Sequence, residues 1–105
     1  SKYKNILLGD MLELGKYSKK LHKEAAKMIN KSSINKVFVL GKDIKETFNK
    51  IKTQKKGKIL KNKKEILSLI KNNLKHNDYL MVKGSNVTGL KNIISQIRLG
   101  QLNAL

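Results

Sequence analysis

The sequence of 105 residues has no cysteine, no proline and no tryptophan. Without cysteine the chain forms no disulfide and no thiolate metal site, which fits a reducing compartment, so we expect a cytoplasmic location. The sequence also lacks a run of about 18 apolar residues that would span a bilayer, so we expect no membrane partner. With 39% hydrophobic residues, residues 1–105 are expected to form a single domain with a modest core.

Acidic residues are scarce as well, with 7 against 24 basic residues and a formal charge of +17. Such a charge is compatible with nucleic-acid binding, because lysines that neutralise phosphates release counterions. However, Arg98 is the only arginine, lysines are scattered along the whole chain, and aromatic residues amount to 5%. Arginine and aromatic side chains are the preferred groups for base contacts and stacking. We therefore expect a solvated lysine-rich surface, and a basic nucleic-acid-binding domain is the alternative function.

Four apolar runs of strand length alternate with four helical patterns. Strands are predicted at residues 5–8, 36–40, 58–60 and 79–82. The helices are predicted from apolar residues at helical spacing, which are Tyr17, Leu21, Ala25, Met28 and Ile29, then Ile44, Phe48 and Ile51, then Ile66, Ile70 and Leu74, and finally Leu90, Ile93, Ile94 and Ile97. Capping boxes are predicted for Asp43 with Glu46 and for Asn62 with Glu65. Residues 100–105 are expected to fray.

Alternating strands and helices of this length require right-handed crossovers. The predicted fold class is therefore α/β, with a mainly parallel sheet of about four strands and helices on both faces. Ligands of such sheets bind beyond the carboxyl ends of the strands. The loops of interest are therefore residues 9–16, 41–43, 61–63 and 83–89.

The loop after the first strand reads GDMLELG and places Asp10 and Glu13 between two glycines. Two carboxylates near one strand end are able to hold Mg²⁺, accept hydrogen bonds from a ligand, or orient a lysine. Alternatively, Asp10 is a turn or cap residue and Glu13 is solvated. The apolar residues Met11, Leu12 and Leu14 favour a loop that packs against another part of the protein, such as a second domain.

The loop after the fourth strand reads KGSNVTG, residues 83–89. Its glycines allow a ligand to approach the backbone, Ser85, Asn86 and Thr88 offer hydroxyl and amide groups, and the N–H groups at the start of the next helix favour an anion. The loop suits a carboxylate or a phosphate, although it has neither the P-loop nor the dinucleotide-binding spacing. The alternative is a helix start capped by Asn86 or Thr88.

The two histidines give no metal site. His22 lies at the border of the apolar stripe of the first predicted helix, and His76 lies in a polar turn. Neither has a second histidine or a cysteine at ligand spacing. No nucleophile is paired with a base by sequence order alone, so no catalytic residue is assigned.

Together the two loops carry a resemblance to a known family. The segment ILLGDMLELGKYSKKLH is followed, at about the family's separation, by DYLMVKGSNVTGL. This order resembles the C-terminal domain of MurF-type UDP-N-acetylmuramoyl-tripeptide:D-alanyl-D-alanine ligases over nearly all of residues 3–99. In the Mur ligases, cytoplasmic enzymes of peptidoglycan precursor synthesis, that domain is Rossmann-like and closes over a central ATPase domain.

The resemblance implies a part in an ATP-dependent amide ligase. The family uses ATP and Mg²⁺ to form an acyl phosphate on UDP-N-acetylmuramoyl-tripeptide, and the amine of D-alanyl-D-alanine then attacks it. By family position, the residues around the incoming dipeptide are Lys83, Ser85, Asn86 and Thr88. Those near the interdomain cleft, on the nucleotide side, are Asp10, Glu13 and His22. The implied partner within the protein is its own central ATPase domain, which with other domains holds most of the ATP and Mg²⁺ contacts.

The match also shows departures from the family. Where the family has a basic residue after KGS and an acid at the start of the next helix, this chain has Asn86 and Lys91, which leaves the anchoring charge at the acceptor site open. The match begins partway into the family's domain and includes no UDP-binding or P-loop domain, so we expect no ligase activity from these residues alone. The strand missing from the match would leave an unpaired sheet edge, through which we expect self-association.

Overall fold

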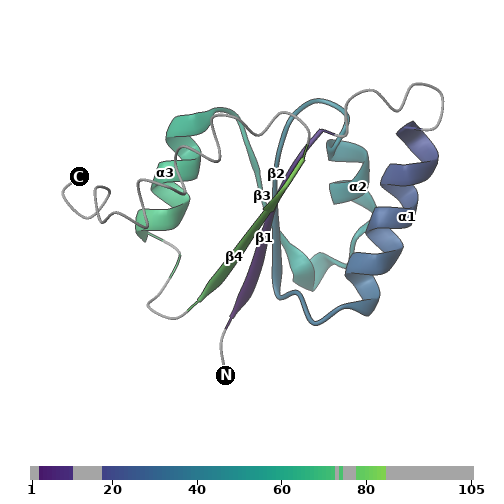
Figure 1. The fold of residues 1–105 in the computed structure, drawn as a ribbon, viewed down its shortest axis with the longest axis horizontal. Coiled ribbons are helices and arrows are strands. Elements are labelled where there is room, and N and C mark those ends of the chain that lie inside the picture. Colours follow the sequence, from purple (N-terminus) through teal and green to yellow (C-terminus); the bar gives the residue numbers. More distant parts are fainter. Residues whose placement is uncertain (1–2, 11–17, 73, 75–77, 85–105) are drawn as a thin grey trace.

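The fold is a four-stranded parallel sheet with helices on both faces (Figure 1). The computed structural model describes residues 3–10, 18–72, 74 and 78–84. The strands are β1 (Lys4–Gly9), β2 (Lys36–Leu40), β3 (Lys56–Leu60) and β4 (Tyr79–Lys83), in the order β3-β2-β1-β4. The helices are α1 (Ser18–Lys31), α2 (Lys45–Lys50) and α3 (Lys63–Asn72), with a short 3-10 turn, η2 (Thr53–Lys55), before β3. The predicted α/β class is confirmed.

The helices are divided between the two faces by the direction in which the chain crosses the sheet. From β1 the chain steps to β2 and then to β3, and it afterwards returns past β1 to β4. Because each crossover is right-handed, this reversal moves the connecting helix to the opposite face. Figure 1 shows α1 and α2 on one face and α3 on the other.

Two apolar clusters fill the two sides of the sheet, because successive strand residues point to opposite faces. On the α1 and α2 face the buried residues are Ile6, Leu8, Ala26, Ile29, Val37, Val39, Ile44, Phe48 and Ile51. On the α3 face they are Leu7, Phe38, Leu60, Ile66 and Leu69. Strands β1 and β2 are thus covered on both sides, which explains their nearly continuous apolar sequences.

The buried face of α1 differs from the predicted stripe. The buried side chains are His22, Ala26 and Ile29, whereas Ala25 is half-buried and Met28 is 73% exposed. The prediction that Met28 belongs to the buried face is therefore wrong for the part of the chain that is described. The helix carries a second apolar column, Ala25 and Met28, beside the buried one.

One of the two predicted capping boxes is confirmed. The N–H of Glu65 donates to the Asn62 side-chain oxygen at 3.1 Å, and the Glu65 carboxylate accepts from the N–H of Lys61 at 2.6 Å, one residue earlier than a standard box would place it. The Asp43–Glu46 box is wrong. Helix α2 starts after Ile44, whose own side chain forms no cap, and the N–H of Glu46 donates to the Asp43 carbonyl oxygen and not to its side chain.

The fourth predicted helix and the tail at 100–105 lie outside the described residues, and the single-domain organisation stays a prediction. Among the helices described here, none has the length and apolar character needed to cross a membrane.

Candidate functional site at the carboxyl ends of β1 and β4

The two sequence motifs emerge from neighbouring strands at the same edge of the sheet. β1 pairs with β4 in parallel, with Leu8 opposite Lys83, so the chain leaves both strands side by side at Gly9 and Gly84. This is also the point where the strand order reverses, since β1 is followed in the sheet by β2 on one side and by β4 on the other. In open α/β sheets, ligands bind at such a switch point.

The backbones of the two motifs touch directly. Gly84 has a φ of +146°, a conformation that favours glycine, and a methyl group added there would lie 2.8 Å from Cα of Gly9. A side chain on Gly84 would therefore not fit between the two segments without a shift of the backbone. The KGS and GD motifs therefore form one continuous main-chain surface at the switch point.

Asp10 ties the end of β1 to the loop that follows β2. Its carboxylate oxygens accept hydrogen bonds from the N–H of Ile44 at 2.8 Å and from the N–H of Lys42 at 3.0 Å. Gly41 makes this possible, because its φ is +146° and any side chain there would overlap the Asp10 carboxylate. These two bonds of Asp10 are structural, and they reach a distant loop and not the chain next to Asp10.

The loop at 41–43, one of the four loops predicted at this edge, therefore lies beside the end of β1, although none of its residues was predicted as a site residue. Lys42 and Asp43 are exposed, and the backbone of Lys42 is fixed by Asp10. The sequence signal for this loop is the tripeptide GKD directly after an apolar strand, which resembles the GD that follows the preceding strand. It is too short to identify a site without the pairing of β1 with β2.

His22 lies inside the contact between α1 and α2. Only 1% of the residue is exposed, and its carbonyl oxygen accepts a hydrogen bond from the Thr47 hydroxyl at 2.9 Å. Thr47 is fully buried. This contact holds the two helices of one face together, so His22 has at least a packing role in the part of the protein that is described.

Lys83 is exposed and lies on the α1 side of β4. It lines a groove there with Met81, whereas Leu80 and Val82 pack toward α3. The other predicted site residues, Glu13, Ser85, Asn86 and Thr88, lie outside the described residues. Of the seven predicted site residues, the structure thus places Asp10 and Lys83 at the carboxyl end of the sheet and His22 in the helix layer.

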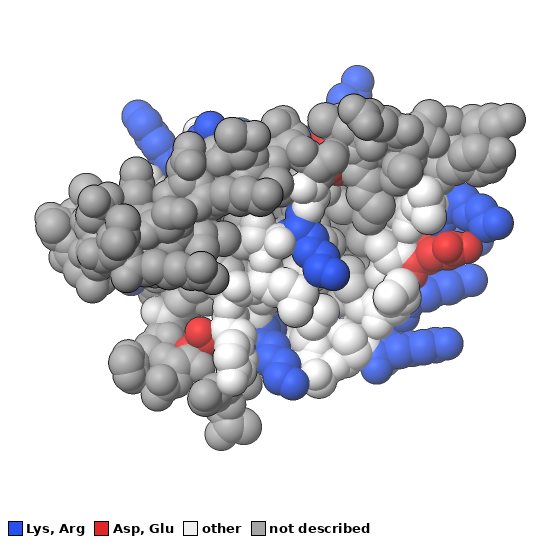
Figure 2. Space-filling model, viewed as in Figure 1, with Lys and Arg blue, Asp and Glu red and all other residues white. Residues whose placement is uncertain are grey.

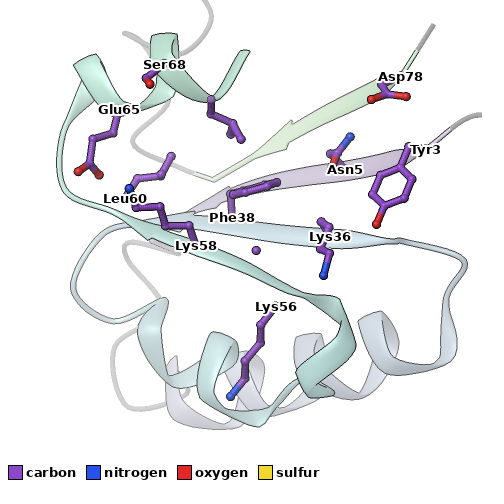
Figure 3. Close-up of a pocket in the computed structure, with 12 residues that line it drawn as sticks. Tyr3, Asn5, Lys36, Phe38, Lys56, Lys58, Leu60, Glu65, Ser68 and Asp78 are labelled. Atoms are coloured by element: carbon purple, nitrogen blue, oxygen red, sulfur yellow. The ribbon is translucent and has the colours of Figure 1, made fainter. Parts of the chain in front are cut away.

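A large open hollow of about 810 Å³ lies elsewhere, on the α3 face (Figure 3). Its lining includes Asn5, Phe38, Lys58 and Glu65, and none of Asp10, His22 or Lys83 lines it. The Lys56 side chain points away from it in Figure 3, and its ammonium lies 5.8 Å from the centre of the Phe48 ring on the other face. The hollow has mixed charge and no convergent set of polar groups, so we place the candidate site at the switch point.

The described lysines do not form one continuous patch on the face shown in Figure 2. In Figure 2 they project at separate points of the visible face, with acidic side chains among them. Some are used internally: the Lys55 ammonium donates to the carbonyl oxygens of Ser32 at 2.9 Å and Ile34 at 2.6 Å, and the Lys36 ammonium donates to that of Gln54 at 3.0 Å. Among described residues there is no group of three histidine, cysteine or acidic side chains that would hold a metal ion.

Several proteins of known name are similar to this chain. A ligase from Buchnera aphidicola subsp. Baizongia pistaciae (strain Bp), named UDP-N-acetylmuramoyl-tripeptide--D-alanyl-D-alanine ligase, is 38% identical over 92% of this chain and 21% of its own length. The ligase of the same name from Bacillus subtilis (strain 168) is 32% identical over 90% of this chain and 21% of its own length. The chain thus spans about a fifth of the length of the curated relatives it matches.

Solved structures have the same fold. The MurF ligase from Thermotoga maritima, in complex with ADP, superposes with a TM-score of 0.73 and 21% identity over 99% of this chain and 23% of its own. A MurF structure from Acinetobacter baumannii gives a TM-score of 0.69 and 16% identity, over 91% of this chain and 22% of its own. The family described as "Mur ligase, glutamate ligase domain" matches residues 2–86. These residues make up most of the chain and include both strand ends of the candidate site, and the chain therefore belongs to the Mur ligase family.

Proposed function

We propose that this chain is the substrate-closing domain of a cytoplasmic, ATP-dependent ligase that joins D-alanyl-D-alanine to UDP-N-acetylmuramoyl-tripeptide. The observation that carries the proposal is the direct contact of Gly9 with Gly84 at the switch point of the sheet. It unites the two motifs on which the family resemblance depends. The names of the curated relatives support the choice of substrates.

The described residues suit the positioning of a small anion. The carboxylate of a dipeptide needs a cation or several N–H donors. Lys83 is exposed at the end of β4, and Lys42 is exposed just after the end of β2. These two strands lie on either side of β1, so the usual strand spacing places their ends about 10 Å apart. In this proposal Ser85, Asn86 and Thr88 add donors next to Gly84, while Asp10 fixes the backbone that carries Lys42. The domain would then hold the amine of the dipeptide toward the acyl group.

The proposal gives this chain a minor part in holding the nucleotide and the magnesium ion. The Asp10 carboxylate accepts two backbone N–H groups, and no cluster of three potential metal ligands occurs among the described residues. In the proposal ATP and Mg²⁺ are therefore held mostly by other domains of the protein, and Asp10, Glu13 and His22 act near the nucleotide side of the cleft. No chemical step is assigned to this chain's side chains.

The proposal is tested by NMR titration of the ¹⁵N-labelled chain with D-alanyl-D-alanine. The amides of Gly9, Lys42 and Gly84 are expected to shift, those of Lys56 and Gly57 at the opposite end of the sheet are expected to stay, and L-alanyl-L-alanine serves as the control ligand. Ser85→Ala and Thr88→Ala should weaken the response. Unchanged amides at the carboxyl ends of β1 and β4 at saturating dipeptide would refute the proposal.

The alternative of a nucleic-acid-binding domain gains no support from these relatives. The ammonium groups of Lys36 and Lys55 donate hydrogen bonds to backbone carbonyl oxygens of this chain, so these two lysines serve the fold. A duplex-binding module would bind with a steep salt dependence. Binding that is absent at low ionic strength removes that alternative.

A further inference from the structure

Six lysines lie at the end of the sheet where the parallel strands begin, which is the lower end in Figure 1. They come from the starts of β1 and β2, from the last turns of α1 and α2, and from the connection into β3. The crossover helices run antiparallel to the strands, so their carboxyl ends lie beside the strand starts. We call these residues the amino-edge lysines, and they are Lys4, Lys31, Lys36, Lys50, Lys52 and Lys55.

The segment that follows α1 holds lysines from distant parts of the chain. The Lys4 ammonium donates to the Ser33 hydroxyl at 3.0 Å, and the Lys55 ammonium donates to the Ile34 carbonyl oxygen at 2.6 Å. Both acceptors are neutral oxygens. These contacts therefore fix the lysine side chains near one another and leave their positive charges uncompensated.

The ends of α1 and α2 are joined at the same place. The Asn30 side chain donates to the Lys50 carbonyl oxygen at 3.3 Å and accepts from the N–H of Lys52 at 2.8 Å. Lys31, the last residue of α1, is next to Asn30. Because Lys4, Lys31, Lys50 and Lys52 are all exposed, the fold presents four ammonium groups to solvent from fixed backbone positions.

The acidic residues that the structure describes are distributed differently. Glu24 lies halfway along α1, and Asp78 lies at the strand starts, directly before β4 and across β1 from β2. The others lie at the opposite end of the sheet or in the helix turns that start there, and they are Asp10, Asp43, Glu46 and Glu65. The amino edge from β1 to β3 thus carries positive charge with no described acid beside it.

We propose that the amino-edge lysines dock the protein on anionic phospholipid headgroups, as a peripheral contact with a membrane surface. An anionic leaflet attracts clustered lysines within about a Debye length and requires no fixed donor geometry. Ammonium groups on flexible stems meet that requirement. A peripheral contact also needs no membrane-spanning run, and it was the lack of such a run that led us to expect no membrane partner.

Two tyrosines flank the lysines and favour a lipid surface over a polynucleotide. Tyr3 precedes Lys4 and is 44% exposed, and Tyr79, which lies opposite Lys4 in the register of β1 with β4, is 52% exposed. Tyrosine is enriched where a membrane meets water, because its ring is apolar and its hydroxyl is polar. Base recognition favours arginine instead, and the described residues include no arginine.

A contact at this end leaves the candidate site open. The six residues of β1 span about 20 Å between the amino-edge lysines and the strand end at Gly9. Gly9 and Gly84 therefore lie at the far end of the sheet from the bound surface. Membrane docking of this kind is independent of the proposed ligase activity.

Co-sedimentation of the full-length protein with vesicles tests the proposal. Vesicles of phosphatidylglycerol and phosphatidylcholine in equal parts present anionic headgroups, and vesicles of phosphatidylcholine alone are the control. We expect binding to the first and not to the second. The bound fraction should fall as NaCl is raised from about 0.1 to 1 M, because the Debye length shortens from about 10 to 3 Å.

Two variants with equal loss of charge separate the amino edge from the overall charge. The first replaces the exposed amino-edge lysines by glutamine, namely Lys4, Lys31, Lys50 and Lys52. The second replaces four exposed lysines at or just before the starts of α2 and α3, namely Lys45, Lys61, Lys63 and Lys64. One lysine near an anionic leaflet changes the affinity about fivefold. The first variant should therefore bind on the order of 100-fold more weakly, and the second within about threefold of the unaltered protein.

The other outcomes overturn the proposal. Equal losses in the two variants would show that the overall charge, and not the amino edge, attracts the vesicles. Binding to a duplex oligonucleotide but not to the anionic vesicles would identify a polynucleotide as the partner, and binding to neither would remove the contact altogether. Circular dichroism checks the fold of each variant. Should the fourfold variant unfold, Lys4→Gln and Lys52→Gln should each weaken vesicle binding about fivefold and Lys45→Gln should not, and equal effects of the three would contradict the proposal.

Discussion

Replacing Asp10 by alanine removes the link between the end of β1 and the start of α2. The carboxylate accepts two backbone N–H groups at 2.8 and 3.0 Å. Hydrogen bonds to a charged group contribute about 1.5–3 kcal/mol each, and because Asp10 is partly exposed the lower end applies. The N–H of Ile44, a fully buried residue, would lose its side-chain acceptor, whereas that of exposed Lys42 gains water. We expect Asp10→Ala to lower the free energy of unfolding by about 2 kcal/mol and Asp10→Asn by about 1 kcal/mol.

Urea unfolding followed by far-ultraviolet circular dichroism measures this effect, since the chain has no tryptophan. Asp43→Ala is the matched control, because Asp43 lies in the loop that Asp10 binds and the N–H of Glu46 donates to its backbone carbonyl oxygen, which alanine keeps. Its substitution should change the free energy by less than about 0.5 kcal/mol. Amide hydrogen exchange should accelerate at Ile44 in Asp10→Ala. If Asp43→Ala costs as much as Asp10→Ala, or if exchange at Ile44 is unchanged, the assignment of the cap to Asp10 is wrong.

Other consequences of the structure are tested in the same way. Gly84→Ala forces a strained backbone and a contact of 2.8 Å with Gly9, and should cost about 2 kcal/mol in urea unfolding, whereas Gly9→Ala, whose nearest contact would be 3.8 Å, should cost clearly less. Thr47→Val removes a buried hydroxyl that donates to a helix carbonyl and should cost about 1 kcal/mol, while Thr53→Val at an exposed position should be neutral within about 0.5 kcal/mol. The 105-residue chain is expected to self-associate through the edge of β4 that no described strand pairs with, and a sedimentation coefficient that is independent of concentration would contradict this.

The strands and the fold class follow from the sequence because the physics that sets them is local. An apolar run such as KVFVL is buried on both sides wherever it pairs, and the alternation with helices leaves few topologies. The Asn62–Glu65 box is also local, since donor and acceptor lie within one turn. The position of the two motifs at one edge then follows from parallel pairing of β1 and β4.

What the sequence left open depends on contacts between distant residues. The helix start at α2 is served by Asp10, 34 residues before Ile44, so the local signal of Asp43 was misleading. The apolar stripe of α1 was identified, but which of its columns is buried depends on what lies beside the helix. For the candidate site, the sequence identified the GD and KGS segments and placed the loop at 41–43 at the same edge, while the bonds from that loop to Asp10 required the register of β1 with β2.

The contact between Gly9 and Gly84 has a consequence for how this protein tolerates change. Two peptide segments meet there without an intervening side chain, so their spacing is set by the main chain alone. A Cβ on Gly84 would force the two segments to shift, whereas one on Gly9 would meet its neighbours at ordinary contact distances. The approach of the two motifs thus depends on the absence of one side chain, at Gly84, which no pattern of charged residues would reveal.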